Sequence, residues 1–239
     1  MPLPELAAVL DTYLELSRTA RERFAGALEG RLLLRSVFDA DGVSVVVAAG
    51  IAGAAALCVD ASAETLREGL RAGLCDFVVR TLDEALRILK NELRRGLPVS
   101  VCLAADPEAC MGEMLVRGVQ PDLVSADSSA GGGWPAVFAE RGATVLALAP
   151  APDAETSLLW WSIAQDAVRS MPRIAALAAE ALDPGRADTG ARRRWLEGAP
   201  RYSGRSFGAR QCLRMTAGES AAFTERVRRE FPAAVVTRA

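Results

Sequence analysis

Short apolar runs recur between residues 32 and 149, with little alternation of polar and apolar positions. They occupy residues 32–36, 55–60, 75–79, 99–104, 122–126 and 144–149. Short apolar runs without alternation are typical of strands that are covered on both faces, as in a parallel sheet. The pattern therefore predicts about six buried strands.

Between these runs the apolar positions follow a helical period. The predicted helices are residues 42–53, 62–73, 81–96, 107–118 and 134–142. The clearest is 81–96, where Thr81 and Glu84 have the spacing of a capping box. This alternation predicts an α/β fold: an open, doubly wound, mostly parallel sheet of about six strands, Rossmann-like, within residues 1–150 and with a helix at its N-terminus. In such folds ligands bind at the carboxyl ends of the strands.

Residues 151–239 are predicted to form a mainly helical C-terminal extension. The segment 155–183 is predicted as a long helical region, with Trp160 and Trp161 near its start. Neighbouring positions on a helix point about 100° apart, so one narrow face cannot bury both indoles. We therefore expect this pair to contribute to the contact between two subunits of a homodimer.

An arginine-rich stretch at residues 183–214, which includes Trp195 and Tyr202, is predicted to be irregular. Two interpretations stay open for it. It is either an arm that wraps around the protein with its arginines in solvent, or a surface for phosphate or nucleic acid. Residues 216–231 then predict a capped amphipathic helix, and residues 233–239 an edge strand.

Composition and charge exclude several classes of protein. The chain has 239 residues, 51% of them hydrophobic, and a formal net charge of -2. This charge favours neither nucleic acid nor an acidic membrane surface. No apolar run reaches the roughly 18 residues of a membrane-spanning helix, and the N-terminal segment lacks the basic start of an export signal. We therefore expect a cytoplasmic protein.

The reactive side chains limit the available chemistry. The chain has no histidine, which removes imidazole as a general base and as a metal ligand. The cysteines show no CxxC spacing, so we interpret them as buried thiols and expect neither disulfides nor a metal site. They are Cys58, Cys75, Cys102, Cys110 and Cys212. No catalytic residue can be assigned from the pattern.

Three stretches resemble the central Rossmann-like domain of urocanase, the urocanate hydratase of histidine degradation. They are residues 11–34, 57–86 and 96–130, and the segment "RGVQPDLV" is the most specific part. The resemblance implies the fold predicted above. It also implies a homodimer and a tightly held NAD that acts as an electrophile toward the imidazole ring of the substrate.

In the family that the chain resembles, a glycine-dense turn after the first strand holds the NAD pyrophosphate. Glycines let the backbone amides and the helix N-terminus approach the phosphates. Here the turn is "SVFDADGVS", which keeps only Gly42 and places Asp39 and Asp41 where phosphates would lie. We therefore expect no tightly bound NAD. Asp41 has a second interpretation, as a carboxylate that caps the following helix.

Other contacts that the resemblance implies differ in this sequence. Asp60 ends the second strand and matches an acidic residue that holds the adenosine ribose. Leu10 stands in place of a glutamine, and Asp106 and Pro107 stand in place of an asparagine and an alanine. Of these positions, only Asp60 keeps the side-chain chemistry that the family uses.

After the fifth strand, the run that begins with Asp127, Ser128 and Ser129 replaces one that contains glutamine and histidine in the family. The segment "SSAGGG" fits either a backbone nest for an anion or a flexible loop. The candidate cofactor-binding residues are therefore Gly42, Asp60, Asp127, Ser128 and Ser129.

Three hypotheses for function follow. The favoured one is a urocanase-like protein that has lost hydratase activity and acts as a small-molecule-binding or subunit-type protein. Only a short segment precedes Asp11. The catalytic cysteine segment of the family has no recognisable counterpart in this sequence, and the residues around Cys212 do not match it. The second is a NAD- or nucleotide-dependent enzyme with an altered cofactor site. The third is phosphate or nucleic-acid binding through the arginine-rich stretch.

Overall fold

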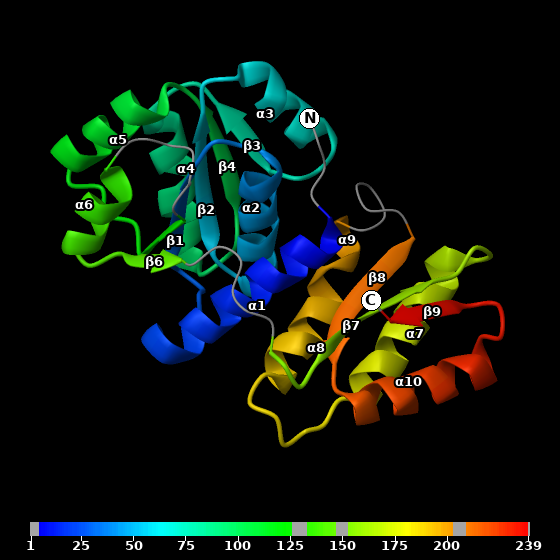
Figure 1. Cartoon of the computed structure of the whole chain (residues 1–239). Helices are drawn as coiled ribbons and strands as arrows, with labels where there is room; N and C mark the ends of the chain where they lie inside the picture. The colour runs from blue at the N-terminus through cyan, green and yellow to red at the C-terminus, as the bar shows by residue number, and fades with distance from the viewer. Residues whose placement is uncertain (1–4, 126–132, 147–152, 203–208, 239) are drawn as a thin grey trace.

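Six parallel strands form the central sheet of the computed structural model, which describes residues 5–125, 133–146, 153–202 and 209–238. The strands are β1 (Leu32–Ser36), β2 (Ala55–Asp60), β3 (Phe77–Val79), β4 (Ser100–Ala104), β5 (Leu123–Ser125) and β6 (Thr144–Leu146). Their order across the sheet is β3-β4-β2-β1-β5-β6 (Figure 1). The predicted doubly wound parallel sheet is therefore confirmed.

The helices of this part start where the sequence supplies capping side chains. They are α1 (Leu6–Arg23), α2 (Ala40–Ala52), α3 (Ala63–Arg71), α4 (Leu82–Arg95), α5 (Pro107–Val116) and α6 (Trp134–Glu140). Ser62 and Thr81 each accept a hydrogen bond from a backbone amide in the first turn of the helix that follows, α3 and α4 respectively. Helix α2 starts two residues before the predicted Gly42, because Asp39 caps it.

Helices cover both faces of the parallel sheet, so its strands are apolar on both sides. On β1, Leu33 packs with α1, α2 and α3, whereas Leu32 and Leu34 pack with α4, α5 and α6. The two layers of helices lie on opposite sides of the sheet in Figure 1. This double burial explains why the strands show little alternation.

The C-terminal part contains the predicted helices together with a second sheet. Its elements are β7 (Ser157–Ser162), α7 (Ala167–Ala181), α8 (Thr189–Gly198), α9 (Pro200–Tyr202), β8 (Arg210–Met215), α10 (Ala217–Glu230) and β9 (Val235–Arg238). The second sheet is antiparallel, in the order β8-β7-β9. The capped helix predicted at 216–231 is confirmed as α10, with a complete capping box from Thr216 and Glu219, and the predicted final edge strand is β9.

The prediction of a helix across Trp160 and Trp161 was wrong, because both lie in strand β7. Adjacent strand residues point to opposite faces, which separates the two indoles. Trp161 is buried and makes an edge contact with Phe223, at 5.1 Å between ring centroids. Trp160 is half-buried beneath the guanidinium of Arg210. A dimer contact is thus unavailable to the Trp161 side chain, and the homodimer stays a prediction.

The arginine-rich stretch was also wrongly predicted as irregular. Its described residues include helix α8 and strand β8, and both Trp195 and Tyr202 are buried. The Nε1 atom of Trp195 donates to the backbone oxygen of Cys212 at 2.8 Å. The aromatic residues of this stretch therefore belong to the core of the protein.

Helix α1 joins the two parts of the chain, and one apolar cluster contains buried residues from both. The Tyr13 hydroxyl donates to the backbone oxygen of Ala191 at 2.7 Å, and the Tyr13 ring lies 5.5 Å from that of Trp195. Arg214 forms two short hydrogen bonds with Asp11. Among the described residues, no helix is long and apolar enough to cross a membrane.

Candidate functional site

The sheet reverses its winding direction between β1 and β5. The chain leaves β1 for β2 on one side and later returns to place β5 on the other side of β1. In open α/β sheets this switch point forms the ligand crevice at the carboxyl ends of the strands. Two of the predicted site residues, Gly42 and Asp60, follow or end the neighbouring strands β1 and β2 at this edge. Asp127, Ser128 and Ser129 lie outside the described residues.

The turn between β1 and α2 has a backbone shape that glycine adopts easily, yet it carries side chains. Val37 has φ 60°, in the left-handed region that a β-branched residue rarely adopts. Phe38 is fully buried and fills space toward α3, where a Cβ added to Gly69 would lie 2.3 Å from the Phe38 ring. Side chains therefore occupy part of the turn that a glycine-dense loop would leave open.

Asp39 occupies the N-terminus of α2 with its own carboxylate. Its Oδ1 accepts a hydrogen bond from the Gly42 amide at 2.7 Å and lies 3.4 Å from Nη2 of Arg35. The cap role is therefore that of Asp39, whereas Asp41 is an exposed residue of the first helical turn. An amide at a helix N-terminus and a guanidinium are groups that bind anions. Here a carboxylate of the chain already contacts both.

Asp60 links two turns at the same edge of the sheet. Its Oδ2 accepts a hydrogen bond from the Phe38 amide, and its Oδ1 accepts one from the Ser62 amide, each at 2.7 Å. Both oxygens of the carboxylate therefore hold backbone groups. This structural role accounts for an acidic residue at the end of β2.

The remaining positions of interest have local roles. Asp106 is the N-cap of α5, where it accepts a hydrogen bond from the Ala109 amide at 2.8 Å, and Pro107 is the first residue of that helix. Proline suits this position because its missing amide would have no partner there. Leu10 is fully buried on α1 and belongs to the core.

A family model described as the urocanase Rossmann-like domain matches residues 8–147. The chain belongs to this family. The match extends from α1 to the end of β6, and it includes the switch point and the turn between β1 and α2. The C-terminal part, from β7 to β9, lies outside the urocanase match.

Arg35 is the residue of this urocanase-family site that the sequence patterns missed. It lies at the carboxyl end of β1 and is 1% exposed, with Nη1 3.4 Å from the Ser125 hydroxyl of β5. Its side chain thus spans the switch point between the two strands. The available signal was a charged residue inside an otherwise apolar strand, since fully buried arginines are rare unless they are paired.

Gly42 is expected to be required for the turn. A Cβ at this position would lie 2.1 Å from the Val37 backbone oxygen, so Gly42→Ala should lower the free energy of unfolding by about 2 kcal/mol. The matched control is Gly112→Ala in α5, where a Cβ meets no atom within 4 Å. That variant should gain about 0.5–1 kcal/mol because alanine favours a helix. Urea denaturation of both variants tests the difference, and equal effects would contradict it.

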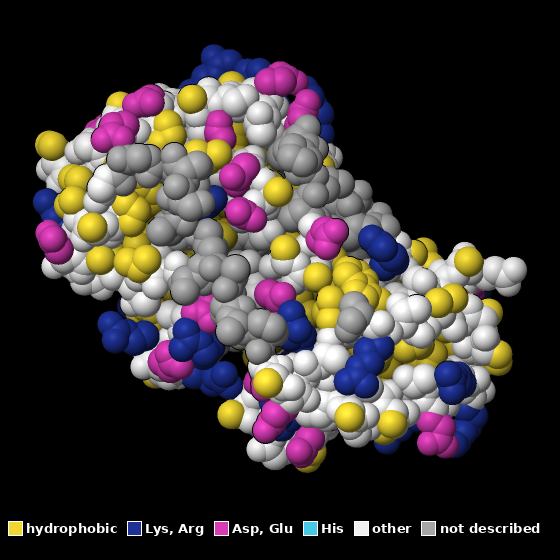
Figure 2. Space-filling view, in the orientation of Figure 1, with side chains coloured by type: hydrophobic (Ala, Val, Ile, Leu, Met, Phe, Trp, Pro, Cys, Tyr) yellow, Lys and Arg dark blue, Asp and Glu magenta, His cyan; other side chains and the backbone are white. Residues whose placement is uncertain are grey.

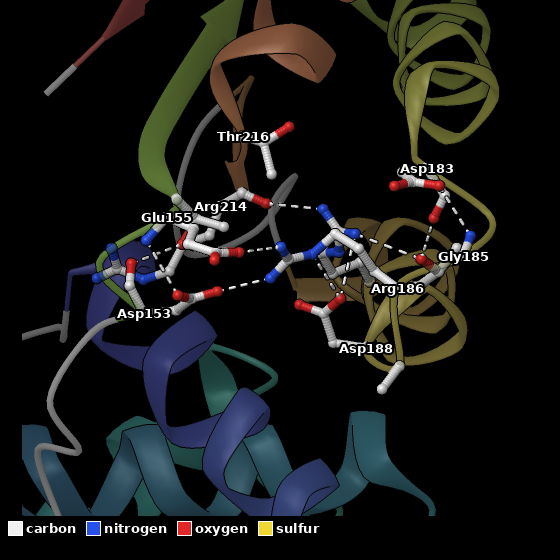
Figure 3. Close-up of polar contacts among 12 residues, drawn as sticks. Asp153, Glu155, Asp183, Gly185, Arg186, Asp188, Arg214 and Thr216 are labelled. Atoms are coloured by element: carbon white, nitrogen blue, oxygen red, sulfur yellow. Dashed lines mark hydrogen bonds and ion pairs between the residues drawn. The ribbon is translucent and has the colours of Figure 1, made fainter.

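A second polar cluster lies between α1 and the C-terminal part, where Arg186 contacts three carboxylates (Figure 3). Its closest ion pairs are with Asp153 at 2.6 Å and Glu155 at 2.9 Å, and Asp188 lies at 3.3 Å. The adjacent cavity of about 320 Å³ is lined by arginines and carboxylates alike. The lining of this cavity contains four arginines and four carboxylates, so its charges balance.

Most described arginines of the 183–214 stretch have acidic or aromatic partners. The pairs are Arg186 with Asp153, Arg192 with Glu219, Arg194 with Glu29, Arg201 with Asp76, Arg210 with the Trp160 ring, and Arg214 with Asp11. On the face shown in Figure 2, basic and acidic side chains are interspersed. The described part of this stretch therefore lacks the clustered, unpaired basic charge that a nucleic-acid surface uses.

All five cysteines are buried free thiols, as predicted. Burial raises the pKa of the Cys110 thiol to about 11 and raises that of Cys212 further. Thiols with raised pKa values are weak nucleophiles at neutral pH, because little thiolate is present. Among the described residues, no cluster of cysteines and carboxylates is arranged to hold a metal ion.

Proposed function

We propose that this urocanase-family protein neither hydrates urocanate nor retains NAD, and that it acts as a small-molecule-binding or subunit-type protein in the cytoplasm. The observation that carries the proposal is the Asp39 carboxylate at the N-terminus of α2, in contact with both the Gly42 amide and Arg35. These are the groups that would meet a pyrophosphate in a Rossmann-like turn.

The residues present do not fit the pyrophosphate of NAD. Two negative charges a few Å apart repel each other by roughly 1 kcal/mol in water and by several times more at a partly buried site. Asp39 is 43% exposed and Arg35 is 1% exposed, so the turn is only partly open to water. The side chains of Val37 and Phe38 further limit the approach of phosphates to the backbone.

The thiol chemistry of the chain also supports the loss of hydratase activity. Cys212 lies in strand β8, fully buried, and its thiol pKa is raised chiefly by burial. Such a thiol is poorly placed to meet a substrate or to act as a base. No step of urocanate hydration is therefore assigned to a residue of this chain.

Incubation of the purified chain with urocanate and added NAD tests the lost activity. We expect the ultraviolet absorbance of urocanate to change no faster than in a sample without protein. A urocanase of known activity serves as the positive control. Turnover that depends on the chain and survives repurification would contradict the proposal.

A second candidate function is an enzyme that binds NAD or another nucleotide in an altered way. The observation that favours it is Arg35, a fully buried guanidinium at the switch point of the sheet. If the Asp39 side chain turned away, its carboxylate would no longer compete with a phosphate for the Gly42 amide and the Arg35 guanidinium. Calorimetric titration of the unaltered chain with NAD separates the two candidates, because the second predicts binding and the first predicts none.

A further inference from the structure

A groove of about 690 Å³ lies in the C-terminal part, outside the urocanase match. It is formed by α7, α8 and the start of β8. Its walls are mainly apolar, and residues that line it include Met171, Ala175, Ala176, Ala179, Leu196 and Pro200. Concave, mainly apolar spaces of this size are typical of small-molecule sites.

Gln211 of β8 provides a buried polar group in this groove. The residue is 3% exposed and lines the groove, and its Oε1 is buried with no hydrogen-bond partner among the described residues. A buried acceptor without a donor costs free energy, so native proteins usually satisfy it. A donor on a molecule bound in the groove would satisfy Oε1 once a rotation of the Gln211 side chain turns that atom toward the groove.

The charged residues at the groove do not select an ion. Arg193 and Glu197 are exposed, have opposite charges and lie one turn apart on α8. Arg210 stacks over the Trp160 ring, which directs its guanidinium to that indole. Among the described residues that line the groove, Gln211 Oε1 is the buried side-chain polar atom that lacks a hydrogen-bond partner.

We propose that this groove binds a neutral, mainly apolar small molecule with one hydroxyl or N–H group that donates to Gln211 Oε1. The inference rests on the small-molecule-binding role proposed above, and it places that role away from the switch point of the parallel sheet. It does not depend on whether the turn between β1 and α2 binds NAD.

Fluorescence titration of the full chain with N-phenyl-1-naphthylamine tests the proposal. This probe is neutral and apolar, has one N–H donor, and brightens in apolar surroundings. Its N-methyl derivative has the same rings without the donor. One hydrogen bond to a buried acceptor should make the N–H probe bind roughly 3- to 10-fold more tightly than the N-methyl probe. In Gln211→Leu the two probes should bind with equal affinity.

A second pair of variants tests the groove itself. Ala176 is a partly exposed lining residue of α7, so Ala176→Phe should fill the groove and abolish binding of both probes. Ala136→Phe, at an exposed position of α6, should bind them like the unaltered chain. These variants and the two probes decide the outcome even if Gln211→Leu does not fold.

Several results would overturn the inference: no binding of either probe, equal affinity of both probes for the unaltered chain, or equal binding by Ala176→Phe and Ala136→Phe. Sedimentation without probe can give a further contradicting result. If the unaltered chain is a dimer and Ala176→Phe dissociates it, the groove is an interface between two copies of the chain. Retained NAD in the same preparations would contradict the proposed function while leaving the groove result unchanged.

Discussion

Replacing Arg192 with methionine is expected to lower the free energy of unfolding by about 3–5 kcal/mol at pH 7. The side chain of Arg192 is fully buried, and its Nη1 lies 2.7 Å from Oε2 of Glu219, which is 3% exposed. Methionine fills similar space but leaves the Glu219 carboxylate buried without its cation. An unpaired buried charge is far more costly than the pair is stabilising.

The pH dependence of this loss follows from the pKa of Glu219. Desolvation raises this pKa, but the hydrogen bond from Arg192 and those from the backbone amides of Asp183 and Thr216 bring it below 4.5, its ordinary value. A lowered pKa stabilises the fold above pH 4.5, and this contribution is lost as the pH falls through the folded-state value. Without Arg192, desolvation dominates the pKa of Glu219 and raises it. Protonation of Glu219 then removes part of the loss in the free energy of unfolding. Its deficit should therefore shrink below about pH 5.

The matched control is Arg193→Met, one residue further along α8, where the side chain is exposed. It should change the free energy of unfolding by no more than about 0.5 kcal/mol. Urea denaturation of both variants at pH 7 and at pH 4.5 provides the comparison. If the two substitutions were equally costly, or if the Arg192 deficit did not depend on pH, the buried pair would not have the role described.

Removing the acidic groups from the turn between β1 and α2 is expected to create NAD binding. In the double variant Asp39→Gly, Asp41→Gly, the Gly42 amide and Arg35 lose the Asp39 carboxylate as their partner. Loss of charge repulsion and of the carboxylate that competes with a phosphate at the turn amounts to on the order of 3 kcal/mol, or roughly a hundredfold in affinity. Glycine at the N-cap costs only a few tenths of a kcal/mol, and glycine at position 41 in the first turn of α2 costs about 0.5–1 kcal/mol.

Isothermal titration calorimetry with NAD measures this gain. A charge-matched control, Asp83→Asn with Glu225→Gln, removes two exposed carboxylates outside the turn. The control should bind NAD no better than the unaltered chain. If the control gained as much affinity as the turn variant, net charge rather than the Asp39 contact would explain the effect.

Much of the parallel-sheet part could be predicted from its sequence because local and long-range signals agree there. The strand residues 55–60 are apolar on both faces, and Ser62 and Thr81 mark helix starts with side chains that do cap them. Burial on both faces removes alternation, so the apolar runs and the caps point to the same fold. Family resemblance added the position of the turn but not its conformation.

The C-terminal part was harder to predict because the contacts of its strands are long-range. Strand β7 does alternate, with Leu159 and Trp161 buried and their neighbours only partly so. The adjacent tryptophans concealed this period of two. Partners of β7 come from residues far along the chain, in β8 and β9, which no local pattern reveals.

The site shows a similar division between local and spatial information. The sequence identified the acidic turn, but only the fold shows that Asp39, not Asp41, caps α2 and that Arg35 lies beneath it. Likewise, the groove around Gln211 is built from α7, α8 and β8, which are separate in the sequence. Chemistry that depends on three elements meeting cannot be inferred from any one of them.

Native mass spectrometry of the unaltered chain, purified without added cofactor, tests directly whether the chain retains NAD. A cofactor held by the turn between β1 and α2 would stay with the folded chain and would be released when the same sample is denatured. We expect identical masses per chain in the native and denatured samples, because Asp39 already contacts the anion-binding groups of the turn. A native mass larger by one NAD per chain would contradict it.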